Sequence, residues 1–238
     1  MTIQHRLVEY KDGDTLLEGY LAYDDSITEP RPGVIIAHTW RGRSEQECAR
    51  ADQLAALGYV GFALDMYGKG LLGTNPEENG AMMQPLMDDR AMLQNRMSVA
   101  LAVAAEQAET DANNMAVMGY CLGGLCALDL ARTGANLKGA ISFHGLFDAP
   151  DNITDPQIRA KVLCLDGHDD PMTDSDKVAA LQKEMTDAGV DWQLHTYGHT
   201  MHGFTNPEAN MPDMGIKYNA DANRRSWVAL ENFLEEIF

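Results

Sequence analysis

The fold is decided by residues 114–131, which read NMAVMGYCLGGLCALDLA. A short apolar run meets a turn bracketed by Gly119 and Gly123, and the turn opens into a segment rich in alanine and leucine. Strand, sharp turn and helix in this order form a nucleophile elbow, here with Cys121 where serine is commoner. The glycines leave room for a strained backbone, and the unpaired N–H groups of a helix start favour a thiolate and a developing oxyanion.

A plainer interpretation of the same stretch is open. Cysteine is among the most buried residue types, and Gly-x-Cys-x-Gly also fits an ordinary tight turn between a strand and a helix. The two interpretations differ in what must follow. A catalytic cysteine needs an acid and a histidine further along the chain.

The composition predicts one globular domain over residues 1–238. A chain of 238 residues with 45% hydrophobic residues suits a single α/β core. The first residues carry no apolar stretch of a secretory signal, and no run approaches the roughly 20 apolar residues that span a bilayer. The cysteines, at positions 48, 121, 126 and 164, show no paired spacing. We therefore expect reduced thiols and a cytoplasmic location.

The net charge of −18 bounds the partners. Nucleic-acid binding needs a basic footprint, and an anionic membrane surface repels an acidic protein. We interpret the charge as a well-solvated acidic surface and expect neither a nucleic-acid nor a membrane partner. The expected partner is a small-molecule substrate, and the expected assembly is a monomer or a small homo-oligomer.

Alternating strands and helices predict an α/β fold, with a mostly parallel twisted sheet and helices on both faces. The expected strands outside the elbow are 3–10, 15–23, 33–37, 59–64, 139–143, 160–165 and 192–197. The expected helices are 44–57, 85–107, 174–188 and 222–238. Asp-Gly between the first strands predicts an N-terminal antiparallel hairpin, and Ser44 with Glu47 predicts a capping box. Residues 69–84 are rich in glycine and are expected to form a long loop.

An acid and a histidine do follow the elbow, each just past a predicted strand end. The strand 160–165 is followed by Asp166, Asp169 and Asp170, and the strand 192–197 by His199 and His202. The carboxyl ends of parallel strands meet at one edge of a sheet, and nucleophile, acid, histidine is the chain order of the α/β-hydrolase triad.

The competing residues can be ranked. We prefer Asp169 as the acid, because Asp166 is close to the strand and the residue before Pro171 is held extended and directed to solvent. We prefer His202 as the base, because Gly203 leaves the imidazole room, and we interpret His195 as structural. Phe204 is expected to wall the substrate pocket.

The roles follow from the residue types. The imidazole of His202 takes the thiol proton as Cys121 attacks an acyl carbon, and Asp169 orients the ring. The N–H of Leu122 is one expected oxyanion donor. The second is expected from Thr39 or Trp40, in the loop after the strand 33–37, and we favour Trp40.

These residues resemble the dienelactone hydrolase family, cysteine-nucleophile members of the α/β-hydrolase fold. The resemblance covers nearly the whole chain, including residues 34–38, 64–68, the elbow 119–124, 167–169 and His202-Gly203-Phe204. The Tyr-Cys-Leu-Gly-Gly elbow is the most specific part. The resemblance implies a hydrolase of small-molecule esters or lactones that uses no metal and no organic cofactor.

The sequence departs from the lactone-cleaving members of that family in the groups that handle charge. Those members carry a glutamate where this chain has Thr39, which cannot do acid–base work. They also hold a substrate carboxylate with arginines, and Asn206 stands here where one of them is expected. Arg41 and Arg90 are the candidates to take over anion binding, although each also suits an exposed surface position.

Two rival interpretations remain. A metal site from His195, His199, His202 and Asp169 has no recognised zinc spacing, and we expect no metal. A catalytically silent member of the fold that binds a small molecule is the alternative function, because a fold does not establish chemistry.

Overall fold

The computed structural model describes residues 2–238, and the chain divides into two compact units, residues 1–118 and 119–238. The first unit begins with the expected hairpin of β1 (Ile3–Asp12) and β2 (Thr15–Asp24), paired antiparallel from Ile3 opposite Asp24 to Asp12 opposite Thr15. β2 pairs antiparallel with β4 (Val60–Ala63), and β4 pairs parallel with β3 (Arg31–Ala37). The predicted antiparallel start of the fold is therefore confirmed.

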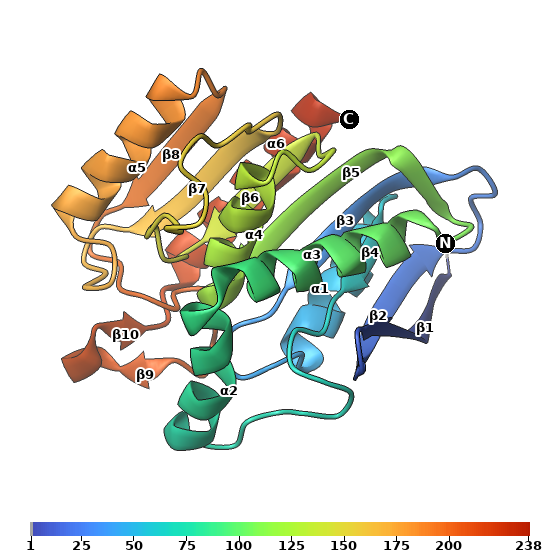
Figure 1. The fold of residues 1–238 in the computed structure, drawn as a ribbon, viewed down its shortest axis with the longest axis horizontal. Coiled ribbons are helices and arrows are strands. Elements are labelled where there is room, and N and C mark those ends of the chain that lie inside the picture. The colour runs from blue at the N-terminus through green and yellow to red at the C-terminus, as the bar shows by residue number, and fades with distance from the viewer. Residues whose placement is uncertain (1) are drawn as a thin grey trace. The chain divides into compact units, whose positions relative to one another are not determined.

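Helices of the first unit pack on these strands. α1 (Glu45–Ala56) begins at the predicted capping box, in which the Ser44 N–H donates to the Glu47 carboxylate at 2.8 Å. It lies so close to β4 that a Cβ on Gly61 would come 2.6 Å from the Cα of Ala51, so only glycine fits there. Figure 1 shows α3 (Arg90–Ala105) in front of the strands of this unit and α1 behind them.

The segment between β4 and α3 differs from the sequence prediction. Residues 69–84 were expected to be a loop and 85–107 one helix. Instead α2 (Pro76–Asp88) begins within the expected loop, capped by the Asn75 side chain, and the helical path breaks at Asp89 before α3. The Asp89 side chain accepts the Met92 N–H at 2.9 Å and starts the new helix. Pro85, read as a helix start, lies inside α2.

The second unit contains parallel strands and the elbow. β6 (Gly139–Phe143), β7 (Lys161–Gly167) and β8 (Trp192–Tyr197) pair parallel in that order. β5 (Thr110–Tyr120) begins in the first unit, and it leads into α4 (Leu122–Arg132), as the elbow predicted. The mostly parallel sheet of the predicted fold class is thus present.

Helices cover both faces of the second unit's strands. On one face α4 and α5 (Ser175–Asp187) meet β7 in an apolar cluster. Its buried members are Leu128, Phe147, Val162, Cys164, Leu181 and Met185. On the other face α6 (Ala220–Ile237) packs on β6, where a Cβ on Gly139 would meet Ile237 at 2.5 Å. Figure 1 shows α5 in front of β7 and β8 and α6 behind β6.

A short hairpin between β8 and α6 was not predicted. It consists of β9 (Asn210–Met211), the 3-10 turn η1 (Pro212–Met214) and β10 (Ile216–Lys217). Strands this short carry no period that a sequence pattern can reveal. Across residues 2–238, no helix has the length and apolar character that crossing a membrane requires.

Candidate active site

Cys121 lies at the turn between β5 and α4 in a strained conformation. Its φ is 55° and its ψ −117°, and this left-handed region is costly for a residue with a side chain. The turn is tied down on both sides, because the Cys121 N–H donates to the Phe143 carbonyl and its own carbonyl accepts the Gly124 N–H, both at 3.0 Å. A Cβ on Gly119 would lie 2.1 Å from the Gly123 oxygen, so the first glycine of the motif is required. The thiol is half-buried.

His202 follows β8, and a short hairpin holds its main chain. The His202 N–H donates to the Gly215 carbonyl at 2.9 Å, and its carbonyl accepts the Lys217 N–H at 3.0 Å. The imidazole is 4% exposed. Gly203 adopts a positive φ of 67° and a Cβ there would touch Ile216, which explains the glycine beside the histidine. The hairpin that the sequence did not reveal is therefore the backbone support of the predicted base.

The acid that meets His202 is Asp170, which corrects the sequence preference for Asp169. The Nδ1–H of His202 donates to Asp170 Oδ2 at 2.7 Å, and both side chains are buried. Asp169 is exposed to solvent.

The turn after β7 explains the correction. The Asp170 N–H donates to the Gly167 carbonyl at 3.0 Å, which closes a tight turn, and the Asp169 N–H is held by the Thr200 carbonyl at 2.9 Å. The turn directs the Asp170 side chain inward although Pro171 follows it. Asp170 Oδ1 then accepts the Met172 N–H at 2.8 Å, which fixes the carboxylate. The extended conformation that Pro171 favours for its predecessor does not by itself predict this turn.

The site is electrostatically biased toward a protonated histidine. Burial by itself lowers the pKa of His202, but the charge of Cys121 and the hydrogen bond to Asp170 raise it to about 10. A hydrogen bond between the ring and the Cys121 thiol also raises this pKa, so the imidazole lies within reach of the sulfur. A second carboxylate lies nearby: burial raises the pKa of Asp166 to about 6, the Thr173 hydroxyl bond opposes this, and the charge of Asp170 adds to it.

His144, which no motif pointed to, lies against His202. It follows β6, is fully buried, and has a positive φ of 38°. The two imidazole centroids are 5.0 Å apart with the rings at 70°. Burial and the positive charge of His202 keep the pKa of His144 well below its usual value. The only sequence signal available was its position directly after a predicted buried strand.

The remaining predicted residues lie as follows. Leu122 is the first residue of α4, so its N–H is one of those that a helix leaves without an internal acceptor. Trp40 and Thr39 lie in the loop after β3, where the Trp40 carbonyl accepts the Tyr67 hydroxyl at 2.9 Å. The Nε–H of Arg41 donates to the Gly73 carbonyl at 3.0 Å, so this cation is partly engaged.

Arg90 and Phe204 complete the predicted set. Arg90 begins α3 and is half-buried. Phe204 is fully buried, and its ring meets His144 at 5.1 Å and Tyr197 at 5.6 Å between centroids. It therefore lies beneath the histidines rather than at an open wall, which corrects the expectation that it walls the pocket.

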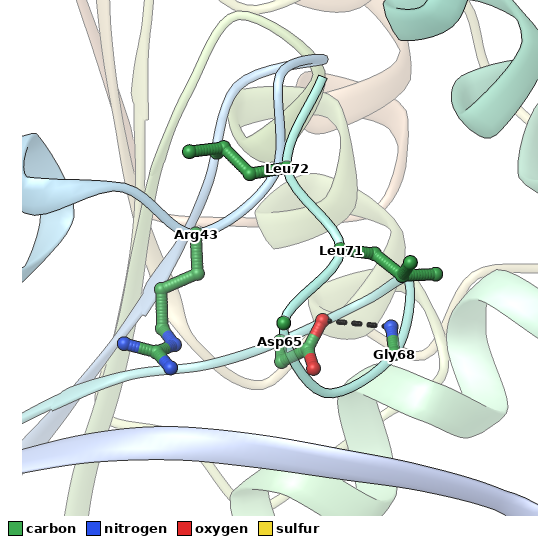
Figure 2. A pocket seen from close by; sticks show the side chains of 6 residues that line it. Arg43, Asp65, Gly68, Leu71 and Leu72 are labelled. Carbon is green, nitrogen blue, oxygen red and sulfur yellow. Dashed lines mark hydrogen bonds between the residues drawn. The ribbon is translucent and has the colours of Figure 1, made fainter. Parts of the chain in front are cut away.

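A cavity of about 190 Å³ in the first unit is a separate feature (Figure 2). Leu71 and Leu72 line it, with Arg43 and Asp65 at its base. Both charged groups are already bonded: Arg43 donates to Glu18, and Asp65 accepts main-chain N–H groups, including that of Gly68 at 3.0 Å. In the part of the chain that the structure describes, no three histidine, cysteine or carboxylate side chains gather in a way that could hold a metal ion.

The chain is similar to known proteins over nearly its whole length. The model of the family described as "Dienelactone hydrolase family" matches residues 17–238. Two solved structures cover 99% of this chain and 99% of their own: one called m3DLH, at 35% identity and a TM-score of 0.94, and a dienelactone hydrolase-like promiscuous phosphotriesterase, P91, from metagenomic libraries, at 34% identity and a TM-score of 0.93.

A relative in sequence carries a more specific name. A probable 2-oxo-3-(5-oxofuran-2-ylidene)propanoate lactonase from Bradyrhizobium is 26% identical over 217 residues, which are 82% of this chain and 84% of the relative.

Proposed function

Because the chain belongs to the dienelactone hydrolase family, we propose that it cleaves small-molecule esters or lactones with a triad of Cys121, His202 and Asp170. Family membership makes the protein a carboxylic ester hydrolase. The triad and the acyl-thioester intermediate are the finer part of the proposal. We expect the enzyme to work in the cytoplasm, where its free cysteines stay reduced.

One observation carries the proposal: the buried 2.7 Å hydrogen bond between His202 Nδ1 and Asp170 Oδ2. Cys121 also raises the pKa of the His202 imidazole. A carboxylate on Nδ1 fixes the tautomer and leaves Nε2 to exchange a proton with a nucleophile. The pKa of about 10 for His202 means that the imidazolium is the dominant form at neutral pH. Its natural counterion is the thiolate of Cys121, the reactive form of the residue.

The reaction proceeds in two halves. The thiolate of Cys121 attacks the acyl carbon, the carbonyl π bond becomes an oxyanion, and its collapse breaks the ester C–O bond while the His202 imidazolium protonates the leaving oxygen. The neutral imidazole then removes a proton from water, whose oxygen attacks the thioester. Collapse of the second tetrahedral intermediate releases the acid and restores the thiolate and the imidazolium. In a lactone the leaving oxygen stays tethered to the acyl group.

The oxyanion needs donors aimed at it. We assign one to the Leu122 N–H at the positive end of α4, and propose the N–H of Trp40, or that of Thr39, for the second. Loss of a single such donor commonly costs about 3 kcal/mol of transition-state stabilisation.

The substrate class follows in part from the relatives. The lactonase and phosphotriesterase names belong to proteins 26% and 34% identical to this chain. Carboxylic esters and lactones are the first candidates. Activated phosphotriesters are the second, because a structure 34% identical to this chain carries the phosphotriesterase name. We propose Arg41 and Arg90 for an anionic substrate group, because Thr39 and Asn206 lack the charge for it.

The test is a panel of nitrophenyl esters, lactones and thioesters with wild type, Cys121→Ala and Cys121→Ser. We expect turnover by wild type, loss to background in the alanine variant with the fold unchanged, and weak activity in the serine variant. Mass spectrometry of a rapidly quenched reaction should find the acyl group on the peptide containing Cys121. Full turnover by the alanine variant would move the nucleophile elsewhere.

The alternative is a catalytically inactive protein of the same fold that binds a small molecule, and cysteine labelling of the wild type tests it. Iodoacetamide should modify Cys121 far faster than Cys126 or Cys164, which are buried, and faster than Cys48. Burial raises the pKa of Cys48 more than Arg43 lowers it, and burial raises the pKa of Cys164 to about 12. Slow labelling at all positions, together with no turnover of any panel member, would favour the binding protein.

A further inference from the structure

His144 adopts a strained backbone conformation. A histidine with φ of 38° lies in the left-handed region, which costs on the order of 1–3 kcal/mol and persists only where the surroundings impose it. Its N–H donates to the Leu165 carbonyl at 2.8 Å, so the backbone that sets this conformation is fixed by β7. A strained, fully buried histidine directly after a strand calls for a physical reason.

The side chain of His144 connects two parts of the segment that carries the base. Nε2 is 2.8 Å from Thr205 Oγ1, and both groups are buried. The same ring meets the edge of His202 and that of Phe204 at angles of 70° and 77°. Its contacts thus include residues 202, 204 and 205, on both sides of Gly203.

The hydrogen bond between Nε2 and Thr205 Oγ1 can form in either tautomer of the neutral ring, because a hydroxyl both donates and accepts. The main chain of His144 itself also makes a hydrogen bond to the ring, which partly opposes the lowering of its pKa.

The charge of this histidine is constrained by its neighbours. The groups that face the pair of histidines are Cys121 in the elbow, Asp170 and Asp166 from β7 and the turn after it, and His202 itself. Burial and the imidazolium of His202 both oppose a second positive charge on His144. His144 is therefore a neutral ring, able to support the imidazolium without repelling it.

We propose that His144 is a positioning residue for the base: it supports the His202 ring edge-on and anchors, through Thr205, the segment on which that ring is carried. The inference rests on the proposed function, since it assigns His144 a role through His202. His144 itself touches no reacting atom.

The test removes the hydrogen bond between His144 and Thr205 by changing either partner. Thr205→Val deletes the hydroxyl at nearly constant volume, and Thr205→Ser, its matched control, keeps it. His144→Asn suits the left-handed backbone but is too short to reach Thr205, whereas His144→Gln places an amide near the position of Nε2. We expect the valine and asparagine variants to lose about 10- to 100-fold in kcat with KM changed less than about 3-fold, because small misplacements of a base are costly. The serine and glutamine variants should stay within about 3-fold of wild type.

A purely structural role would lower the melting temperature in the same variants, so a second readout is needed. The pH profile of Cys121 alkylation by iodoacetamide reports the thiolate–imidazolium pair directly. A displaced His202 loses contacts with Cys121 and Asp170 that raise its pKa. In the valine and asparagine variants we therefore expect the acid limb of the alkylation profile to move to higher pH and the alkaline limb to lower pH. The double variant His144→Asn/Thr205→Val should be no worse than His144→Asn alone, because both substitutions remove the same His144–Thr205 hydrogen bond.

The outcomes separate the inference from the function. Unchanged kcat and an unchanged alkylation profile in the folded valine and asparagine variants would overturn the role of His144 while leaving the triad intact. A chain that alkylates at Cys121 with the expected profile but hydrolyses no panel member would overturn the proposed function, and the alkylation profile would still test His144.

Discussion

Replacing Asp170 by asparagine is the most informative single change to this protein. The substitution keeps the size of the side chain and can keep the bond from the Met172 N–H, which Oδ1 accepts at 2.8 Å. It removes only the negative charge that receives the Nδ1–H of His202. The exposed neighbour Asp169 offers a matched control with the same chemistry one residue away.

The magnitude follows from burial and geometry. The Asp170 side chain is 0% exposed, and its bond to His202 is 2.7 Å long. Breaking a buried charged pair by neutralising one partner costs about 3–5 kcal/mol. If that cost falls on the imidazolium state that the proposed mechanism requires, kcat decreases about 10²- to 10⁴-fold, because 1.36 kcal/mol is tenfold in rate. Asp169→Asn should change kcat less than about 2-fold, as an exposed charge contributes little.

The assay is steady-state hydrolysis of an activated ester, with the pH profile of Cys121 alkylation beside it. We expect Asp170→Asn to shift the alkaline limb of the profile to lower pH, because the pKa of about 10 for His202 depends in part on the carboxylate. Circular dichroism and the melting temperature establish that both variants are folded. Loss of activity in Asp169→Asn with Asp170→Asn near wild type would refute the assignment of the acid.

Three further predictions test the support of the site and the whole chain. Gly215→Ala should lower both kcat and stability, because a Cβ there would lie 2.4 Å from Pro171 Cγ. The control Gly189→Ala has a similar positive φ but nothing within 4 Å of the new Cβ, so it should lower stability alone. Equal losses of kcat in the two variants would contradict the role of the Pro171 contact. Asp166 has a pKa raised to about 6, so its contribution to stability is present at low pH and is lost as the pH rises through about 6. Asp166→Asn should therefore gain up to about 3 kcal/mol over wild type between pH 4 and pH 8 in urea unfolding, and a flat difference would contradict this. Finally, the predicted single domain over residues 1–238 should give one calorimetric transition, and two separable transitions would contradict it.

Local chemistry made much of this fold predictable from the sequence. Ser44 and Glu47 form a capping box from their own side chains, and the Gly119 turn is required by the backbone contact with Gly123. Such features need no information from distant residues. The start of α2 had local signals as well, Asn75 followed by Pro76, but the surrounding glycines outweighed them in the interpretation.

What the sequence could not supply depends on partners far along the chain. The choice between Asp169 and Asp170 is set by a turn whose geometry includes a bond to the Thr200 carbonyl. The proposed role of His144 depends on contacts with His202 and with Thr205, which is 61 positions further along the chain. Residue type and order suggested a Cys-His-Asp set, but the tertiary contacts decide which aspartate meets His202.

The main-chain ladder behind the nucleophile has a consequence for altering this enzyme. The Cys121 N–H is tied to the end of β6, and the His144 N–H, one residue beyond β6, is tied to β7. The turn that carries Cys121, the proposed nucleophile, is thus fixed by main-chain hydrogen bonds to neighbouring strands. Selectivity can then be altered by exchanging surface segments that carry none of these main-chain bonds and lie outside the hairpin that holds His202.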